Sequence, residues 1–250
     1  MNRLENKVAV VTGGSSGIGT AIALRLAKEG AKVVIVGRNE KTLKAVAATD
    51  NNIVYVAGDI TDSRVVKSIV EKLKQDFNGQ LDILVNNAGW CPVQPITEIT
   101  LADYDKAFNL DVRAVVDLTT QALPLLINAK GNIINLSSVG ASHPGANLSM
   151  YVGAKAAIEN FTQSWALDLA GYGVRVNAIA PGAIDTNIWS ATDLSVEDAQ
   201  KHRDGIAAGI PCKRFGTADE VANVAFFLAS QEASYVSGSI YAVDGGMGAM

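Results

Sequence analysis

Short runs of β-branched apolar residues alternate along the chain with longer segments in which apolar residues recur at helical spacing. The short runs are typical of strands buried in a parallel sheet, and the longer segments of amphipathic helices. The runs that predict strands are residues 8–11, 33–36, 53–56, 83–85, 133–136, 174–179 and 240–243. The segments that predict helices are residues 18–29, 40–48, 63–77, 101–129, 150–170 and 219–230.

This alternation predicts a doubly wound α/β fold, with a parallel sheet of seven strands and helices on both faces. Gly30 suits the end of the first helix and Asp62 the start of the third. No linker or internal repeat interrupts residues 1–250, so we expect a single domain. Residues 183–215 depart from the rhythm with a polar stretch and a short helical pattern near 196–208. We expect a substrate lid there, with a plain surface excursion as the alternative.

Composition narrows the classes of function. Apolar residues make up 48% of the 250 residues, as in a compact globular protein, and the net charge of -4 argues against a nucleic-acid partner. Cys91 and Cys212 match no metal spacing and are interpreted as reduced thiols, while His143 and His202 are the only histidines, so no metal site is predicted. The sequence has neither a signal-peptide pattern nor a membrane span, and we expect a cytoplasmic protein.

A glycine-rich turn follows the first predicted strand and opens the first helix. Its glycines, Gly13, Gly17 and Gly19, let a backbone turn tightly and approach a pyrophosphate held by amides at a helix N-terminus. The turn predicts a Rossmann-type dinucleotide site, with a purely structural turn as the alternative. Its predicted cofactor-binding residues are Gly13, Ser15, Ser16, Gly17, Ile18 and Gly19.

Arg38 follows the second predicted strand, where an NAD site commonly has a carboxylate for the ribose 2′-hydroxyl. A guanidinium there can bind a 2′-phosphate and stack on adenine. The sequence therefore favours NADP(H), with NAD(H) possible. Arg38 could instead be a solvated residue at a helix start, and Glu40 is a poorly placed alternative partner for the ribose.

Tyr151 and Lys155 are four residues apart within a predicted helix, so both project from one face. A free phenol titrates near pH ~10, and a nearby ammonium favours the phenolate. The pair therefore suits proton transfer at neutral pH. Taken alone, it is equally a half-buried phenol beside a solvated lysine.

Five motifs in order resemble the short-chain dehydrogenase/reductase superfamily over residues 7–246. They are the glycine turn, Asn86-Asn87-Ala88-Gly89 after the fourth strand, Ser137-Ser138 after the fifth, Tyr151-x-x-x-Lys155, and Pro181-Gly182 after the sixth. The resemblance implies a reductase or dehydrogenase in which a serine hydrogen-bonds the substrate oxygen, a tyrosine transfers a proton and a lysine binds the nicotinamide ribose. The implied catalytic residues are Asn109, Ser138, Tyr151 and Lys155, with Asn109 holding a water in a proton relay.

The same resemblance implies the rest of the cofactor site, beyond the glycine turn and Arg38. Its members are Asp59, Ile60, Asn86, Ala88, Gly89, Tyr151, Lys155, Pro181, Gly182, Ile184 and Thr186. Asp59 would contact adenine, and Ile184 and Thr186 would meet the nicotinamide carboxamide. Each also has a structural alternative, since Asn109 and Asp59 suit helix or turn caps.

The resemblance implies interconversion of a ketone and a secondary alcohol by a homotetramer. Residues 211–216 resemble reductases of 3-oxoacyl thioesters, while sugar, polyol and hydroxysteroid dehydrogenases remain alternatives. A non-catalytic dinucleotide-binding sensor is the alternative of another class. Trp90, Cys91, His143 and Trp189 are candidates for the wall of the substrate pocket by position.

Overall fold

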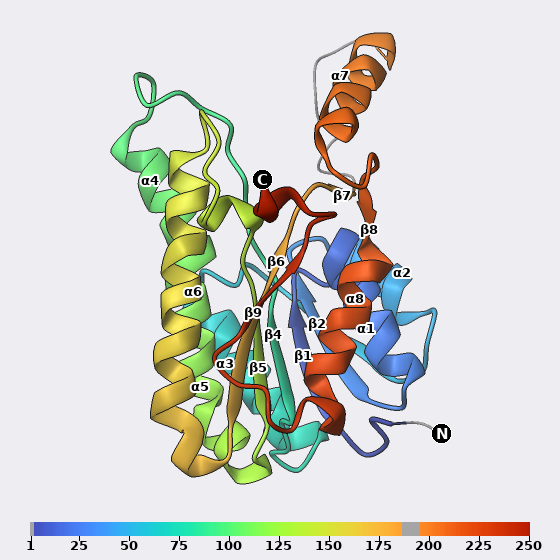
Figure 1. The fold of residues 1–250 in the computed structure, drawn as a ribbon. Coiled ribbons are helices and arrows are strands. Elements are labelled where there is room, and N and C mark those ends of the chain that lie inside the picture. The colour runs from blue at the N-terminus through green and yellow to red at the C-terminus, as the bar shows by residue number, and fades with distance from the viewer. Residues whose placement is uncertain (1–2, 187–195) are drawn as a thin grey trace.

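A computed structural model describes residues 3–186 and 196–250. A seven-stranded parallel sheet lies at its centre, in the order β3-β2-β1-β4-β5-β6-β9 (Figure 1). Its strands are β1 (Val8–Thr12), β2 (Lys32–Gly37), β3 (Ile53–Ala57), β4 (Ile83–Asn86), β5 (Asn132–Leu136), β6 (Arg175–Pro181) and β9 (Ile240–Val243). The predicted doubly wound α/β fold is confirmed. Strand order reverses between β1 and β4, which is where such sheets bind ligands.

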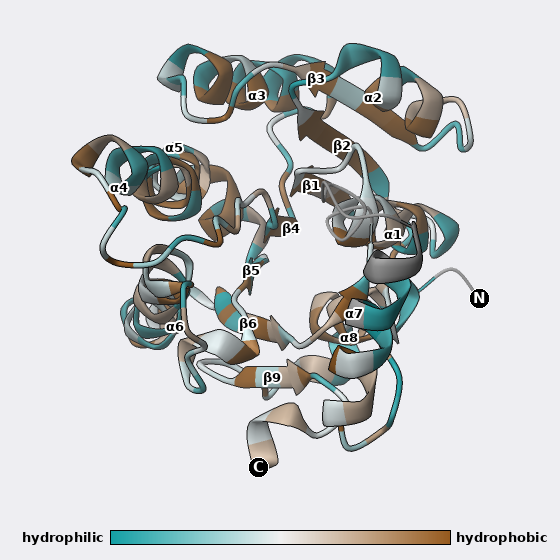
Figure 2. Cartoon of the chain, turned by 90° about the horizontal axis from the view of Figure 1, so that it is seen from above, coloured by the Kyte–Doolittle hydropathy of each residue, from teal (hydrophilic) through white to brown (hydrophobic). Residues whose placement is uncertain are grey.

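Helices cover both faces of the sheet (Figures 1 and 2). One face packs against α1 (Gly17–Lys28), α2 (Glu40–Ala47) and α8 (Ala218–Ala229). The other packs against α3 (Ser63–Asp76), α5 (Ala114–Ala129) and α6 (Ser149–Leu169). Two separate apolar cores result, because alternate strand residues point to opposite faces: Val11 and Val33 join one core, Val10 and Val34 the other.

The helix ends follow the local sequence. The Asp62 side chain accepts a hydrogen bond from the Arg64 N–H at the start of α3, and Gly30 takes a φ of +97° just after α1. A side chain is rarely tolerated at such a φ, which explains the glycine. Both predicted helix ends are confirmed.

The long helix predicted over residues 101–129 is interrupted. It consists of α4 (Leu101–Phe108), a π-helical segment (Asn109–Arg113) and α5. A π-helical turn inserts one residue into the helical repeat and so changes which side chains face the sheet. The interruption lies beside the predicted catalytic residues.

The segment after β6 contains α7 (Val196–Gly209), which confirms the helical pattern predicted there. Two further strands, β7 (Ile184–Asp185) and β8 (Gly216–Thr217), pair with each other in a separate two-stranded sheet. Figure 1 shows α7 standing above the carboxyl ends of the strands, away from the main sheet. The sequence did not predict β7 and β8, because two-residue strands have no periodicity to recognise.

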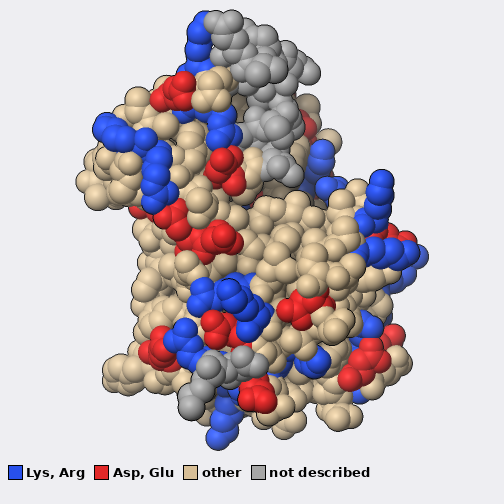
Figure 3. All heavy atoms as spheres, turned by 90° about the vertical axis from the view of Figure 1, so that its right-hand side faces the viewer, with Lys and Arg blue, Asp and Glu red and all other residues tan. Residues whose placement is uncertain are grey.

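Basic and acidic side chains are interspersed on the face drawn in Figure 3. Several exposed or partly exposed pairs are in contact in the described chain, such as Lys44 with Glu40 and Lys72 with Asp76. No helix within residues 3–186 and 196–250 has the length and apolar character needed to cross a bilayer.

Candidate active site

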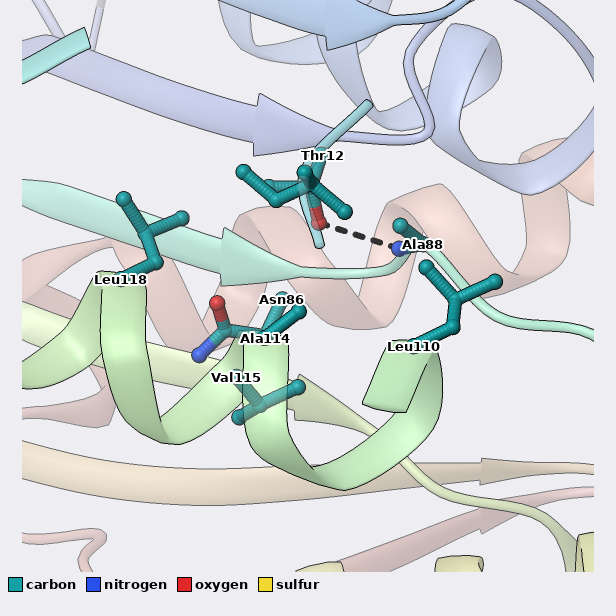
Figure 4. Close-up of a pocket in the computed structure, with 8 residues that line it drawn as sticks. Thr12, Asn86, Ala88, Leu110, Ala114, Val115 and Leu118 are labelled. Atoms are coloured by element: carbon teal, nitrogen blue, oxygen red, sulfur yellow. Dashed lines mark hydrogen bonds between the residues drawn. The ribbon is translucent and has the colours of Figure 1, made fainter. Parts of the chain in front are cut away.

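The glycine-rich turn is fixed by hydrogen bonds from the neighbouring strand β4. The Asn87 side-chain amide donates to the Thr12 carbonyl over 2.8 Å. The Thr12 hydroxyl in turn accepts from the backbone N–H groups of Asn87 (2.9 Å) and Ala88 (3.0 Å), the latter drawn in Figure 4. The ends of β1 and β4 therefore form one unit at the point where strand order reverses.

The N-terminus of α1 approaches this turn closely and leaves its first amides uncapped. A Cβ on Gly19 would lie 2.3 Å from the Gly13 carbonyl oxygen and 2.5 Å from the Asn87 side-chain nitrogen. The N-cap residue Ser16 makes no side-chain cap, and the first turn of α1 contains no acidic residue. Free amides at the positive end of a helix suit an anion, so the turn fits the pyrophosphate of a dinucleotide.

Arg38 follows β2 on the same edge of the sheet. A Cβ on the adjacent Gly37 would lie 3.2 Å from the Ser15 hydroxyl, which places this strand end against the glycine-rich turn. Arg38 is exposed. Glu40 is engaged elsewhere, because its carboxylate contacts Lys44 over 2.9 Å and accepts from the Tyr55 hydroxyl over 3.3 Å. Glu40 is thus paired with its neighbours, whereas Arg38 is exposed next to the strand end that meets the turn.

Three predicted cofactor residues, Ile60, Asn86 and Ala88, line one small apolar pocket between the strand ends and α5 (Figure 4). The side-chain amide of Asn86 donates to Asn135 over 2.9 Å and to Thr119 over 3.2 Å, which ties β4 to β5 and α5. Asp59 is exposed and accepts from the N–H and hydroxyl of Thr61. Asn86 thus has a sheet-bridging contact, whereas Asp59 lies at the rim.

Ser138, Tyr151 and Lys155 come together from β5 and α6. Lys155 is 5% exposed, its Nζ donates to the Leu136 carbonyl over 3.0 Å, and it lies 5.6 Å from the centre of the Tyr151 ring. Ser138 is 9% exposed, is the second residue after β5, and forms a side-chain hydrogen bond with Tyr151. The neighbouring Ser137 hydroxyl instead donates to Glu159 over 2.8 Å. The structure therefore favours Ser138 over Ser137 beside the tyrosine.

Burial raises the pKa of the Tyr151 phenol above its ordinary value, while the Lys155 ammonium and a hydrogen bond with Ser138 act to lower it. Cys91, when its thiol is ionised, and the Asp111 carboxylate also act to raise it. Lys155 thus acts in the direction that the sequence predicts, but desolvation outweighs it in the protein alone. The phenol is the favoured form of Tyr151 at neutral pH.

Asp111, and not Asn109, lies beside Lys155. The Asn109 side chain is exposed, whereas Asp111 is 1% exposed, with its Oδ2 3.5 Å from the Lys155 Nζ. The Asp111 Oδ1 accepts from the Trp90 N–H over 2.9 Å. Both residues belong to the π-helical segment, whose altered repeat turns Asp111 inward. Sequence reasoning missed Asp111, although an acidic residue within an apolar helical stretch was a visible signal.

The remaining predicted residues close the same edge of the sheet. Pro181 ends β6, and the Gly182 N–H donates to the Val243 carbonyl over 3.0 Å. Thr186 reaches the glycine-rich turn, since a Cβ on Gly17 would lie 3.3 Å from its methyl group. Ile184 is 5% exposed. Trp189 lies outside the described residues.

Gly89 lies where the cofactor turn meets the catalytic residues. A Cβ there would be 3.2 Å from both the Asp111 Oδ2 and the Lys155 Nζ. Within residues 3–186 and 196–250, no three His, Cys, Asp or Glu side chains gather as a metal site would require. The site thus combines an anion-binding turn with a serine, a tyrosine and a buried lysine.

Proteins similar to this chain are known over nearly its whole length. The family model described as Enoyl-(Acyl carrier protein) reductase, a short-chain dehydrogenase/reductase model, matches residues 13–248. The chain is 36% identical to the 3-oxoacyl-[acyl-carrier-protein] reductase FabG of Thermotoga maritima, over 98% of this chain and 99% of the relative. It is 35% identical to the galactitol 2-dehydrogenase of Agrobacterium fabrum, over 98% of each.

A solved structure of a short chain dehydrogenase/reductase family protein aligns with a TM-score of 0.88 and 34% identity, over 99% of this chain and 100% of that one. The fold, the family model and both relatives thus agree along nearly the whole sequence. The chain belongs to the short-chain dehydrogenase/reductase family, whose members bind NAD(P), and the relatives named above are oxidoreductases that act on CH–OH and C=O groups.

Proposed function

We propose that the chain interconverts a ketone and a secondary alcohol with NADP(H), using Tyr151 as the general acid and base. The observation that carries this proposal is the meeting of Ser138, Tyr151 and Lys155 at the strand edge that bears the glycine-rich turn. A dinucleotide-binding sensor needs no buried ammonium beside a phenol. The geometry therefore supports catalysis over simple binding.

The residues of the chain divide the work of carbonyl reduction. The Tyr151 phenol donates its proton to the substrate oxygen, and the Ser138 hydroxyl hydrogen-bonds the same oxygen as negative charge develops there. The Lys155 ammonium favours the phenolate that remains, and in alcohol oxidation the same residues act in reverse. A bound nicotinamide supplies or accepts the hydride.

The proposed preference for NADP(H) rests on the end of β2. Arg38 is exposed beside the glycine-rich turn, and Glu40 is already paired with Lys44. A guanidinium can make charge-assisted hydrogen bonds to a 2′-phosphate. A carboxylate at this position would instead repel the phosphate.

For the substrate, we propose a 3-oxoacyl thioester or a related ketone. One relative is named as a 3-oxoacyl reductase and others as galactitol and sorbitol dehydrogenases. Residues 211–216, which resemble the reductases, follow α7 and run into β8. Oxidation of a polyol with NAD(H) is the second candidate, supported by those two dehydrogenase relatives.

The test is a turnover assay with NADPH and NADH against 3-oxoacyl thioesters, simple ketones, diketones and, in the reverse direction, polyols and hydroxysteroids. We expect NADPH-dependent reduction, lost by about 10²–10⁴-fold in Tyr151→Phe without a change in NADPH affinity. Tyr172→Phe, on an exposed side chain, is the matched control and should keep full activity. Tight NADPH binding without turnover of any compound would favour the sensor and overturn the proposal.

A further inference from the structure

Asp111 is a buried acidic group that the proposed mechanism does not yet use. Its side chain is fully enclosed, 0% exposed, and belongs to the π-helical segment between α4 and α5. Burying a carboxylate is costly unless a charge or hydrogen bond compensates it. The groups that face this carboxylate therefore decide what it does.

The two carboxylate oxygens of Asp111 face two different parts of the site. The Oδ1 accepts from the Trp90 N–H over 2.9 Å, which holds the loop that follows β4. The Oδ2 faces the Lys155 Nζ over 3.5 Å and makes no hydrogen bond within the described chain. That separation is long for a hydrogen bond but close for an ion pair. The principal partner of the Oδ2 is thus the charge of Lys155. Burial raises the pKa of the Asp111 carboxyl, and the Lys155 charge and the Trp90 N–H act to lower it and so favour the carboxylate.

Lys155 is held from two sides, by the Leu136 carbonyl at 3.0 Å and by Asp111. A buried ammonium, like a buried carboxylate, is stable only when it is paired. The carbonyl supplies a hydrogen bond but no net charge. Asp111 is therefore the counter-ion of Lys155 in the site.

Few other ionisable groups surround this pair in the described structure. Tyr151 lies one helical turn before Lys155 on α6, and the Cys91 thiol follows Trp90 in the loop after β4. Lys106 of α4 lies over the Trp90 ring, with its Nζ 3.9 Å from the ring centre. Burial raises the pKa of Cys91 to about 11, so its thiol is neutral near pH 7.

We propose that Asp111 is a positioning residue of the catalytic centre, whose carboxylate holds and balances the Lys155 ammonium and so adds to the burial that favours protonated Tyr151, the acid for carbonyl reduction. This inference rests on the proposed roles of Tyr151 and Lys155. It adds a residue that sets the balance between the acid and base forms of the tyrosine.

The charge of Asp111 changes how readily Tyr151 ionises. With Asp111 ionised, the Asp111–Lys155 pair is neutral, so ionising Tyr151 adds an unbalanced negative charge to a buried site. Without the Asp111 charge, the phenolate itself becomes the counter-ion of Lys155. Asp111 accordingly acts to raise the pKa of Tyr151, opposite to Lys155.

Asp111→Asn is the central test, because it removes the charge while its carboxamide oxygen can still accept from the Trp90 N–H. Reduction needs the Tyr151 phenol and falls as the pH rises, whereas oxidation needs the phenolate and increases with pH. Both transitions should occur about one pH unit lower in Asp111→Asn. The matched control is Asp105→Asn, which removes the same charge from an exposed position on α4 and should leave the profile unchanged. An unshifted profile, or a shift to higher pH, would overturn the inference.

A second readout needs no substrate and separates this inference from the proposed function. The near-ultraviolet phenolate absorbance is titrated with and without Tyr151→Phe, and the difference isolates the ionisation of Tyr151. Asp111→Asn should lower that midpoint by about one pH unit even if no substrate is turned over. A lowered midpoint with no turnover would leave the inference about Asp111 standing and count against the proposed function.

A paired background keeps the test decisive if Asp111→Asn fails to fold around an unpaired Lys155. The single variant Lys155→Met keeps the Asp111 carboxylate but lacks the lysine. It is compared with the double variant Lys155→Met/Asp111→Asn, which lacks both charges. The Tyr151 midpoint should be lower in the double variant. Equal midpoints would reduce Asp111 to a holder of the Trp90 loop and overturn the inference.

Discussion

The glycine-rich turn, residues 12–19, and the substrate segment, residues 182–186 and 196–216, lie at the same end of the sheet but are built differently. The turn is fixed by backbone contacts: Asn87 bonds the Thr12 carbonyl over 2.8 Å, and the Gly14 N–H donates to the Val36 carbonyl over 3.1 Å. The proposed substrate segment is held by the two-residue pairing of β7 with β8 and by a partly exposed ion pair of Arg203 with Asp185. The N–H groups of Gly182 and Cys212 also tie it to β9 and to the residues that follow β9.

This difference matches what each of the two parts is proposed to bind. A pyrophosphate is the same in every dinucleotide, so its binding turn needs one backbone path, and few residues satisfy that path. The proposed substrate segment includes α7, which stands away from the main sheet, and a surface element of this kind can change shape and sequence without disturbing the sheet.

The largest effect is expected from Gly19→Ala in the turn. The added Cβ would lie 2.3 Å from the Gly13 carbonyl oxygen, so the backbone of α1 or of the turn must move. Overpacking typically costs 1–3 kcal/mol and occasionally more, and a backbone clash this close should cost about 3 kcal/mol or more. Thermal unfolding and fluorescence titration with NADPH should show a lower Tm and a loss of affinity of about 100-fold. An NADPH affinity within about threefold of that of the unsubstituted protein would mean that NADPH binding does not need the close approach of Gly19 to Gly13.

The two cysteines extend the comparison to chemical reactivity. Burial raises the pKa of the Cys91 thiol to about 11 from 9.0, with the Asp111 charge adding to the effect and Lys155 opposing it. Cys212 is exposed in the substrate segment. Because the thiolate is the nucleophile, Cys91 should be alkylated by iodoacetamide at pH 8 about 100-fold more slowly than a thiol of pKa 9.0.

Mass spectrometry of the labelled protein distinguishes the two sites. Cys212→Ser should abolish fast labelling and Cys91→Ser should leave it unchanged. Labelling at Cys91 should rise about tenfold per pH unit up to pH ~11, since the thiolate fraction rises by that factor below the pKa. Equally fast labelling of both thiols at pH 8 would contradict the buried environment of Cys91.

The parts of the site that depend on backbone conformation were the most predictable from sequence. Glycines at 13, 17 and 19 mark places where a side chain would clash or where φ is positive, so the requirement is visible in the residue type. The seven strands were equally visible, because short β-branched runs bounded by turn residues are typical of strands buried in a parallel sheet.

The π-helical segment shows where the sequence was insufficient. Residues 101–129 have continuous helical character, and one extra residue in the repeat leaves no mark in the apolar pattern. That shift decides whether Asn109 or Asp111 faces Lys155. The direction of the Tyr151 pKa shift also could not be predicted from sequence. Burial of the phenol raises this pKa by more than the Lys155 ammonium lowers it, and burial depends on the packing of other elements.

Arg38→Ala tests whether Arg38, at the end of β2 beside the glycine-rich turn, makes the protein prefer NADPH to NADH. Losing charge-assisted hydrogen bonds to a 2′-phosphate should cost about 1.5–3 kcal/mol, or roughly 10–100-fold in the KM for NADPH. The KM for NADH should stay within about threefold, because NADH has no such phosphate. Lys41→Ala, which removes an exposed cation three residues further on, is the matched control. Equal losses with both cofactors would remove the proposed phosphate contact.

The smallest effect is expected from Gly205→Ala in the substrate segment, the counterpart of Gly19→Ala. Both glycines are helical, but a Cβ on Gly205 of α7 would meet nothing within 4 Å. Alanine in a helix interior is favoured over glycine by about 1 kcal/mol, so α7 should become slightly more stable. Hydrogen exchange should slow at the α7 amides while NADPH affinity stays unchanged. Faster exchange in α7, or weaker NADPH binding, would show that this segment is constrained as tightly as the glycine-rich turn.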